Sequence, residues 1–262
     1  MDRNDNWGHA ARFGLFVVAR EVVPEAEWWA MRPEGVSVHA ARVTASAPWA
    51  PWRADRSGVE VTDELERGLA AFRDIEARVV VLAHSSSSFV AGPGWDEAAI
   101  AAMGPHLAPG AIATTNGLDI RMALAHLGIA RPFLVMPAWM TDAVIASAVA
   151  YLAAHGLPVA AASRHVPPPP WQDIAPQNLY REGMAIAQET DTLREQVCAR
   201  CPPEADGVLL AGTGLRCSAL IEAIEASLGR PVVAANQASL WRALRACGIT
   251  APVEGYGRLL RS

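Results

Sequence analysis

The sequence contains one long internal repeat, and this feature constrains the fold more than any other. The segment that starts at Asn116 returns 120 residues later at Asn236. The identical pairs at this spacing are Asn116/Asn236, Ala123/Ala243, Leu124/Leu244, Gly128/Gly248, Ile129/Ile249 and Pro132/Pro252. Gly128 and Gly248 stand where a left-handed helix C-cap belongs, so each copy contains a helix and its end. A single repeat of this length indicates gene duplication and predicts two similar halves.

A second pair of matching segments shows what precedes this helix in each half. Residues 80–85 (VVLAHS) match residues 208–213 (VLLAGT) at an offset of 128. Each segment is a short apolar run, typical of a buried strand, that leads into small residues. The change of offset from 128 to 120 gives the first half eight additional residues, which we expect around Gly92–Gly94.

Short apolar runs alternate with longer segments of helical period, which indicates βα units around mostly parallel sheets. The expected strands are Phe13–Val18, Val36–Val43, Val79–Ala83, Ala111–Thr114, Pro132–Met136, Val159–Ala162, Val208–Ala211 and Pro231–Ala234. The expected helices are Thr62–Ile75, Asp96–Met103, Gly117–Leu127, Asp142–His155, Gln177–Ala199, Ser218–Leu228 and Ala238–Ala246. We therefore predict an α/β fold of two pseudo-twofold-related parallel-sheet halves, 1–115 plus 236–262 and 116–235, with the site in the cleft between them.

Composition excludes several classes of partner. The net charge of −5 and a pI near 5.8 leave no basic surface for nucleic acid. No stretch reaches the length of a membrane span, and Met1–Arg12 is polar without an apolar signal-peptide core, so we expect a cytoplasmic protein. The four cysteines form no disulfide scaffold, and the Cys198–Cys201 pair has no second pair or His cluster to complete a metal site.

The two strand-end loops carry the polar residues of the repeat. His84 to Phe89 leave one predicted strand with four consecutive serines, and Thr213–Gly214 follow the equivalent strand. Hydroxyls and free backbone N–H groups at such a position suit a carboxylate. A serine-rich turn is also an ordinary helix start, so the anion-site interpretation depends on the repeat.

Four segments together resemble the maleate isomerase and arylmalonate decarboxylase branch of the aspartate/glutamate racemase superfamily. They are residues 79–89, 207–217, 231–241 and 255–259. The resemblance implies a pseudo-twofold α/β fold and chemistry at the α-carbon of a small carboxylate, with no metal or organic cofactor. In that family one or two cysteines at the ends of equivalent strands transfer protons or attack the substrate. The resemblance also implies association into a homo-oligomer.

This chain departs from the family at both cysteine positions, which fall on His84 and Gly212. Glu21 falls near an asparagine with which the isomerases hold a carboxylate, and a tyrosine expected after the fifth strand is replaced within residues 137–140. Cys217 is a candidate displaced nucleophile, but it lies five residues beyond Gly212, at the start of the next predicted helix, where a small buried side chain is the alternative.

We predict His84 as the acid/base group, because an imidazole titrates near neutral pH, and Glu21 as a group that orients or polarises it. A structural histidine and an exposed loop glutamate are the alternatives. The predicted substrate-binding residues are Ser85, Ser86, Gly212, Thr213, Gly214 and Asn236. The leading hypothesis is a cofactor-independent enzyme for proton transfer or decarboxylation beside a carboxylate or carbonyl of a small molecule. The alternatives are a non-catalytic carboxylate-binding pseudoenzyme, and a hydrolase or lyase with new chemistry on His84 and Glu21.

Overall fold

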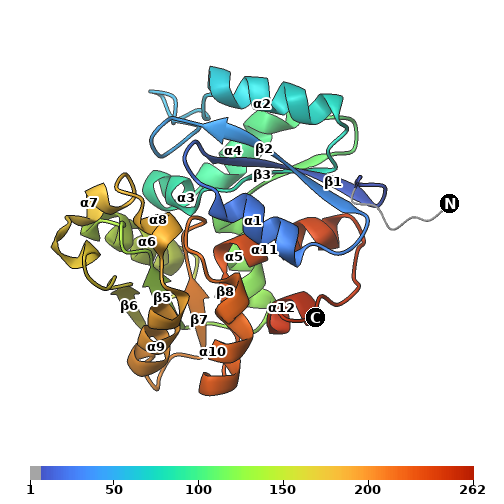
Figure 1. Cartoon of the computed structure of the whole chain (residues 1–262). Helices are drawn as coiled ribbons and strands as arrows, with labels where there is room; N and C mark the ends of the chain where they lie inside the picture. The colour runs from blue at the N-terminus through green and yellow to red at the C-terminus, as the bar shows by residue number, and fades with distance from the viewer. Residues whose placement is uncertain (1–6) are drawn as a thin grey trace.

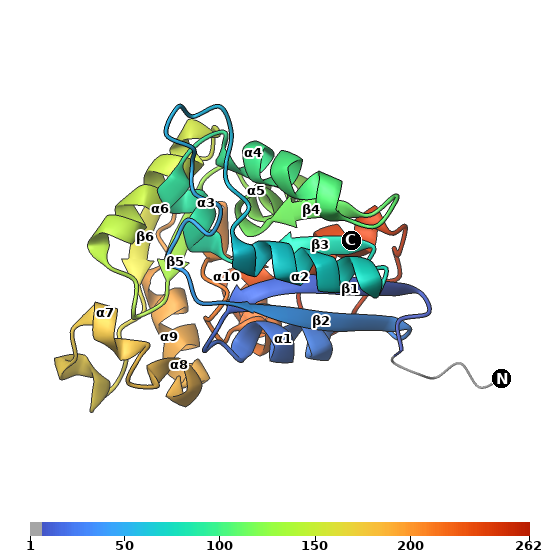
Figure 2. The same cartoon turned by 90° about the horizontal axis from the view of Figure 1, so that it is seen from above.

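The computed structural model describes residues 7–262, so the first six residues of the predicted first half and of the polar N-terminal segment lie outside the described residues. Within this range each of the eight predicted strands is present. They are β1 (Ala11–Val18), β2 (Val36–Val43), β3 (Val79–Leu82), β4 (Ile112–Thr115), β5 (Pro132–Met136), β6 (Ala161–Arg164), β7 (Gly207–Leu210) and β8 (Val232–Ala234). They form two parallel sheets, in the orders β2-β1-β3-β4 and β6-β5-β7-β8 (Figures 1 and 2). The predicted α/β fold with two parallel-sheet halves is therefore confirmed.

The helices cover both faces of each sheet. They are α1 (Val23–Met31), α2 (Asp63–Asp74), α3 (Ser85–Ala91), α4 (Trp95–Met103), α5 (Asn116–His126), α6 (Asp142–Ala154), α7 (Pro176–Leu179), α8 (Met184–Ala187), α9 (Thr190–Arg200), α10 (Ile221–Leu228), α11 (Ala235–Ala246) and α12 (Arg258–Arg261). Short 3₁₀ turns are η1 (Gly104–His106), η2 (Trp171–Asp173) and η3 (Ser218–Leu220). In Figure 1, α2 and α4 lie outside the first sheet, α9 and α10 outside the second, and α1, α5 and α11 between the two.

The alternation of side chains along the strands explains these layers. In β3, Val79 and Val81 enter the central core shared by both halves, whereas Val80 and Leu82 pack in the outer core beneath α2 and α4. In β7, Leu209 likewise enters the central core. The pattern of four buried residues in a row is what a strand covered on both faces requires.

The repeat is visible in the backbone at the helix ends. Gly128 and Gly248 have φ of +68° and +72°, so both adopt the predicted left-handed conformation. The Ile129 and Ile249 N–H groups donate to Leu124 and Leu244 at 2.9 Å, which closes the two helices identically. The helices α5 and α11 pack against each other between the sheets. The division into residues 1–115 plus 236–262 and residues 116–235 stays a prediction.

Several elements differ from the prediction, among them α12, which was not predicted. The helix α1 was not among the predicted helices, although Pro24 near its start and the fully buried Trp28 and Met31 fit a short packed helix. The helix expected over residues 177–199 is wrong as a single element, because Gly183 at φ +96° interrupts it and α7, α8 and α9 replace it. The expected loop from His84 to Phe89 is in fact helical from Ser85 onward.

Candidate active site

The carboxyl ends of β3 and β7 border one cavity of about 430 Å³. Six of the eight predicted site residues line it, namely Glu21, His84, Ser85, Ser86, Gly212 and Thr213. The remaining walls come from the β2 end (residues 45–47), from Trp139 and Met140 after β5, and from Gln177 and Tyr180 near α7. Both halves therefore contribute to one pocket at the position that the topology predicts.

His84 directly precedes the first residue of α3, and one face of its ring packs against the pocket wall. The imidazole stacks on the buried Trp49, with ring centroids 4.3 Å apart and planes 15° from parallel. Its Nδ1 lies 2.9 Å from the Ser87 hydroxyl, which also accepts the Trp49 backbone N–H at 3.0 Å. Burial lowers the pKa of His84 to about 4, since the charged ring loses its water. The shift favours the neutral imidazole in the free protein, and the acid/base role predicted for His84 stays a prediction.

Glu21 is 7% exposed and faces the second strand-end loop. Its Oε2 accepts the Thr213 hydroxyl at 3.2 Å, and its Oε1 lies so close to Gly214 that a Cβ there would approach to 2.5 Å. Burial raises the pKa of Glu21 to about 8, and neither the Thr213 hydroxyl nor Arg42 offsets it. The carboxyl is thus protonated at neutral pH. Its hydrogen-bond partner is Thr213, whereas the Nδ1 of His84 lies against Ser87, so within residues 7–262 no hydrogen bond joins Glu21 to His84. The predicted orienting role of Glu21 stays a prediction.

The second cysteine position is closed to any side chain. Gly212 has φ +101°, which side chains rarely adopt, and a Cβ there would lie 2.6 Å from the Pro137 Cγ. The absence of the thiol is therefore built into the backbone. At His84 the backbone is extended, with φ −147°, and accepts any side chain.

Ser85 bridges the two halves. Its hydroxyl donates to the Asn116 Oδ1 at 2.7 Å and accepts the Gly212 N–H at 3.2 Å. The Asn116 amide in turn donates to Ser239, whose hydroxyl donates to Asp119 at 2.6 Å. The predicted substrate-binding role of Ser85 remains a prediction, because its hydroxyl is already hydrogen-bonded within the protein.

Two other hydroxyls face the cavity without strong partners. The Ser86 hydroxyl has only a 3.8 Å contact to the Met140 sulfur. The Tyr180 hydroxyl is buried and has no hydrogen-bond partner among residues 7–262, although its ring packs edge-on against Trp139 at 5.4 Å. An orphaned buried hydroxyl in a pocket is a site for a ligand atom. Tyr180 was not predicted from the sequence, because it lay within the single helix expected over residues 177–199.

Asn236 lies behind the pocket. Its Nδ2 donates to the Glu27 Oε2 at 2.7 Å and to the Thr213 carbonyl at 2.8 Å, so it supports the second loop. Its contact with substrate remains a prediction, because its amide N–H groups already donate to Glu27 and Thr213 within the protein. Cys217 is 2% exposed, and burial raises the pKa of its thiol well above the usual range. Cys217 lines a different cavity from His84.

The matching family model is that of arylmalonate decarboxylase, and it covers residues 31–260. The chain belongs to the arylmalonate decarboxylase family. The predicted membership of this superfamily branch is confirmed, and with it the prediction of an enzyme of the isomerase or carboxy-lyase kind. A search of curated sequences gave no match.

Solved structures of this fold agree with the assignment. A crystal structure of arylmalonate decarboxylase superposes with a TM-score of 0.72 at 26% identity, covering 95% of this chain and 98% of that one. The maleate isomerase Iso of Pseudomonas putida S16 gives 0.78 at 19% identity, with 96% and 98% covered. A mutant maleate cis-trans isomerase of Nocardia farcinica, with a covalently bound succinylcysteine intermediate, gives 0.76 at 21% identity, with the same coverage.

No group of three or more His, Cys, Asp or Glu side chains within residues 7–262 could hold a metal ion. In the same part of the chain, no helix has the length and apolar character needed to cross a membrane.

Proposed function

We propose that this protein decarboxylates a small malonate-type dicarboxylate without metal or organic cofactor, with Glu21 as the proton donor and neutral His84 as a hydrogen-bonding group. The observation that carries the proposal is the reversed pKa order in one pocket. His84 has a pKa of about 4 and Glu21 a pKa of about 8, so at neutral pH the carboxyl holds the proton and the imidazole does not. Groups whose pKa values are pushed apart in this way mark acid and base assignments.

The reaction needs one proton and one site for negative charge. The bond between the α-carbon and one carboxylate breaks, carbon dioxide leaves, and the electron pair remains as an enediolate on the other carboxylate. Glu21 then donates its proton to the α-carbon, giving the monocarboxylate, and the Glu21 carboxylate regains a proton from water. No oxidant, reductant or co-reactant is required.

Neutral hydrogen-bond donors surround the position where the charge develops. Ser86 and Tyr180 line the cavity, and within residues 7–262 their hydroxyls have only a weak sulfur contact and no partner, respectively. If Ser87 donates its hydroxyl hydrogen to Nδ1 of His84, the ring carries its proton on Nε2 and adds a third donor. Such preorganised donors stabilise an enediolate more than the starting carboxylate.

Two features favour decarboxylation over isomerisation or racemisation. Neither strand-end position carries a thiol that could attack a double bond, and Gly212 has no room for one. A racemase also needs acid/base groups on both faces of the α-carbon, whereas this pocket holds one protonated acid, Glu21, among its lining residues. The competing possibility is a pseudoenzyme that binds carboxylates and does not turn them over.

The proposal is tested by incubating the protein with phenylmalonate, alkyl malonates and maleate in deuterated water and following carbon dioxide release and deuterium incorporation by NMR. Glu21→Gln keeps the shape and removes the proton, so we expect a loss of about 10²-fold or more in kcat. His84→Ala should lose less, since it removes one donor. Turnover of maleate with no malonate reaction contradicts decarboxylation, and thermal shifts without any turnover establish the pseudoenzyme.

A further inference from the structure

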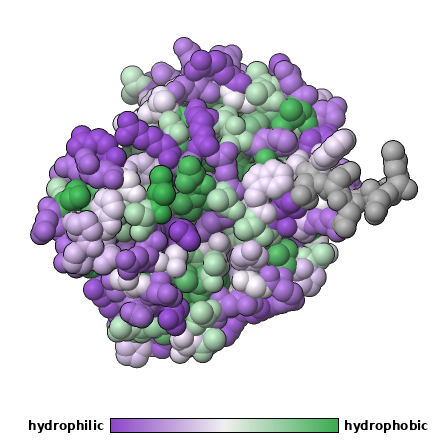
Figure 3. Space-filling model, in the orientation of Figure 1, coloured by the Kyte–Doolittle hydropathy of each residue, from purple (hydrophilic) through white to green (hydrophobic). Residues whose placement is uncertain are grey.

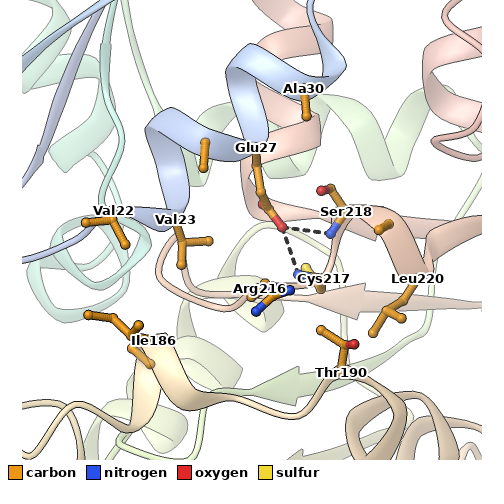
Figure 4. Close-up of a pocket in the computed structure, with 13 residues that line it drawn as sticks. Val22, Val23, Glu27, Ala30, Ile186, Thr190, Arg216, Cys217, Ser218 and Leu220 are labelled. Carbon is orange, nitrogen blue, oxygen red and sulfur yellow. Dashed lines mark hydrogen bonds between the residues drawn. The ribbon is translucent and has the colours of Figure 1, made fainter.

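A second cavity of about 460 Å³ is separate from the candidate active site and shares no lining residue with it. Figure 4 shows the residues that line this second cavity. Three segments wall it: α1, the α8–α9 segment, and the loop that leads from β7 into α10. Its lining is mainly aliphatic, with Val22, Val23, Ile186 and Leu220 pointing into the space. The volume is that of a small-molecule pocket.

Two buried side chains fix the walls in place. The Glu27 Oε1 on α1 accepts the backbone N–H groups of Cys217 and Ser218 at 2.8 and 2.7 Å, drawn as dashed lines in Figure 4. The amide of Gln188, between α8 and α9, donates to the Arg216 carbonyl at 2.8 Å and accepts the Arg216 N–H at 3.2 Å. Both clamps hold the same loop, so the cavity is formed before any ligand arrives.

Within the described part of the chain, the cavity is lined by one unpaired positive charge, whereas its carboxyl group is already hydrogen-bonded. Arg216 is exposed, and its guanidinium makes no hydrogen bond or ion pair with any residue in the range 7–262. The Glu27 carboxyl is already satisfied by two backbone N–H groups and by Asn236. The Thr190 hydroxyl adds one further polar group at the rim. One free cation above aliphatic walls complements a molecule with one negative charge and an apolar body.

The mouth of the cavity leaves apolar surface uncovered. Val22 is 50% exposed and Ile186 is 65% exposed, and both line the cavity. Figure 3 shows an apolar patch on the face of the molecule that carries α1 and α8 in Figure 1. A ligand seated on Arg216 would cover this surface, which favours its binding.

We propose that this cavity binds an apolar monocarboxylate, such as a medium-chain or aryl-substituted acid, with its carboxylate on Arg216 and its body against Val22, Val23 and Ile186. The occupant would contact Val22 and Val23, which directly follow Glu21 in the chain. A smaller cavity of about 130 Å³ shares Val22 and Ile186 with this one and Glu21 and Tyr180 with the reaction pocket. The site is therefore placed to act on the reaction pocket from outside it.

Isothermal titration with octanoate tests the proposal and needs no turnover, so it stands or fails separately from the proposed reaction. We expect saturable binding at one site, no comparable binding of neutral octanamide, and about tenfold weaker binding in Arg216→Gln that Arg216→Lys largely restores. Arg53→Gln removes one charge from an exposed arginine outside both cavities and is the matched control. Ala26→Trp should occlude the cavity and abolish binding.

Three results would overturn the proposal. One is no saturable octanoate binding to the wild-type protein. Another is binding that survives Ala26→Trp but is lost in Ala45→Trp, which narrows the reaction pocket instead. The third is a stable dimer in sedimentation experiments that Ile186→Glu separates, because a second copy of the chain would then cover this surface.

Discussion

The loops after β3 and β7 occupy equivalent places in two duplicated halves, but one presents a large side chain to the pocket and the other presents mainly backbone. The loop after β3 presents a large side chain, His84, from extended backbone and turns at once into a helix. The loop after β7 has Gly212 at φ +101° and Gly214 in close contact with Glu21, so it presents backbone and one hydroxyl, that of Thr213. The two halves share one scaffold, but only the loop after β3 has room for a side chain at the strand end. The loop after β7 instead packs against Glu21 and buries its carboxyl group.

The largest expected effect is on the pH dependence, because burial shifts the pKa values of Glu21 and His84 in opposite directions. Activity that needs protonated Glu21 and neutral His84 should be maximal between about pH 4 and pH 8 and fall tenfold per pH unit outside that range. The profile of kcat/KM measures this directly. A rate that keeps rising through pH 8 would show that Glu21 acts as a base.

Stability should follow the same contrast with opposite signs. The folded pKa of Glu21 lies above its unfolded value, so its contribution to stability is lost as pH rises from about 4.5 to about 8. The folded pKa of His84 lies below its unfolded value, so its contribution is lost as pH falls from about 6.5 to about 4. The Tm of Glu21→Gln should therefore exceed the Tm of the wild-type protein, most clearly at pH 9.

The next effect compares a cysteine placed in each loop. Gly212→Cys forces a side chain into left-handed backbone and against Pro137, so we expect a loss of about 2–3 kcal/mol in unfolding free energy. His84→Cys replaces a larger side chain on permissive backbone and should cost about 1 kcal/mol or less. Urea unfolding of both variants checks the difference, and equal costs would refute the claim that the second loop is closed.

A smaller effect separates adjacent serines. Ser85→Ala leaves the buried Gly212 N–H and the Asn116 carbonyl without their partner, and should cost about 1–2 kcal/mol. Ser86→Ala removes a hydroxyl with only a weak sulfur contact, so its stability should stay within about 0.5 kcal/mol of wild type. A larger loss of unfolding free energy in Ser86→Ala than in Ser85→Ala, measured by chemical denaturation, would contradict the structural role assigned to Ser85.

The smallest effect concerns Tyr180. Tyr180→Phe removes a hydroxyl that has no partner among residues 7–262, so stability should not fall. A hydrogen bond to a charged substrate is worth about 1.5 kcal/mol, so KM should rise about tenfold. An unchanged KM would place the Tyr180 hydroxyl outside the substrate site.

The sequence was sufficient where the signal is local or repeated. The buried strands, the duplication and the left-handed Gly128 and Gly248 were predictable, because apolar runs and helix-closing glycines are determined by neighbouring residues. The helix α1 was missed, since it is stabilised by packing of Trp28 rather than by its own pattern. Gly183, which breaks the helix expected over residues 177–199, lacked a second signal.

The chemistry of the site was less predictable than its position. The topology alone brought His84 and Thr213 to one cavity. The protonation states of His84 and Glu21 depend on burial by residues distant in sequence, such as Trp49 against His84 and Gly214 against Glu21. For that reason the sequence could not predict the directions in which the pKa values of His84 and Glu21 are shifted, and Tyr180 was not foreseen.

The bridge through Ser85 also has a mechanical consequence. Its hydrogen bond from the Gly212 N–H joins the loop after β3 to the loop after β7, and so links the two sheets at the floor of the cleft. Its bond to Asn116 lies within the first sheet, at the ends of β3 and β4. Pulling the halves apart as rigid bodies would rupture the Gly212–Ser85 bond, so we expect substrate entry to proceed by displacement of the short α7 and α8 helices instead. The Gly212 amide should then exchange its hydrogen far more slowly than the amides of residues 176–187.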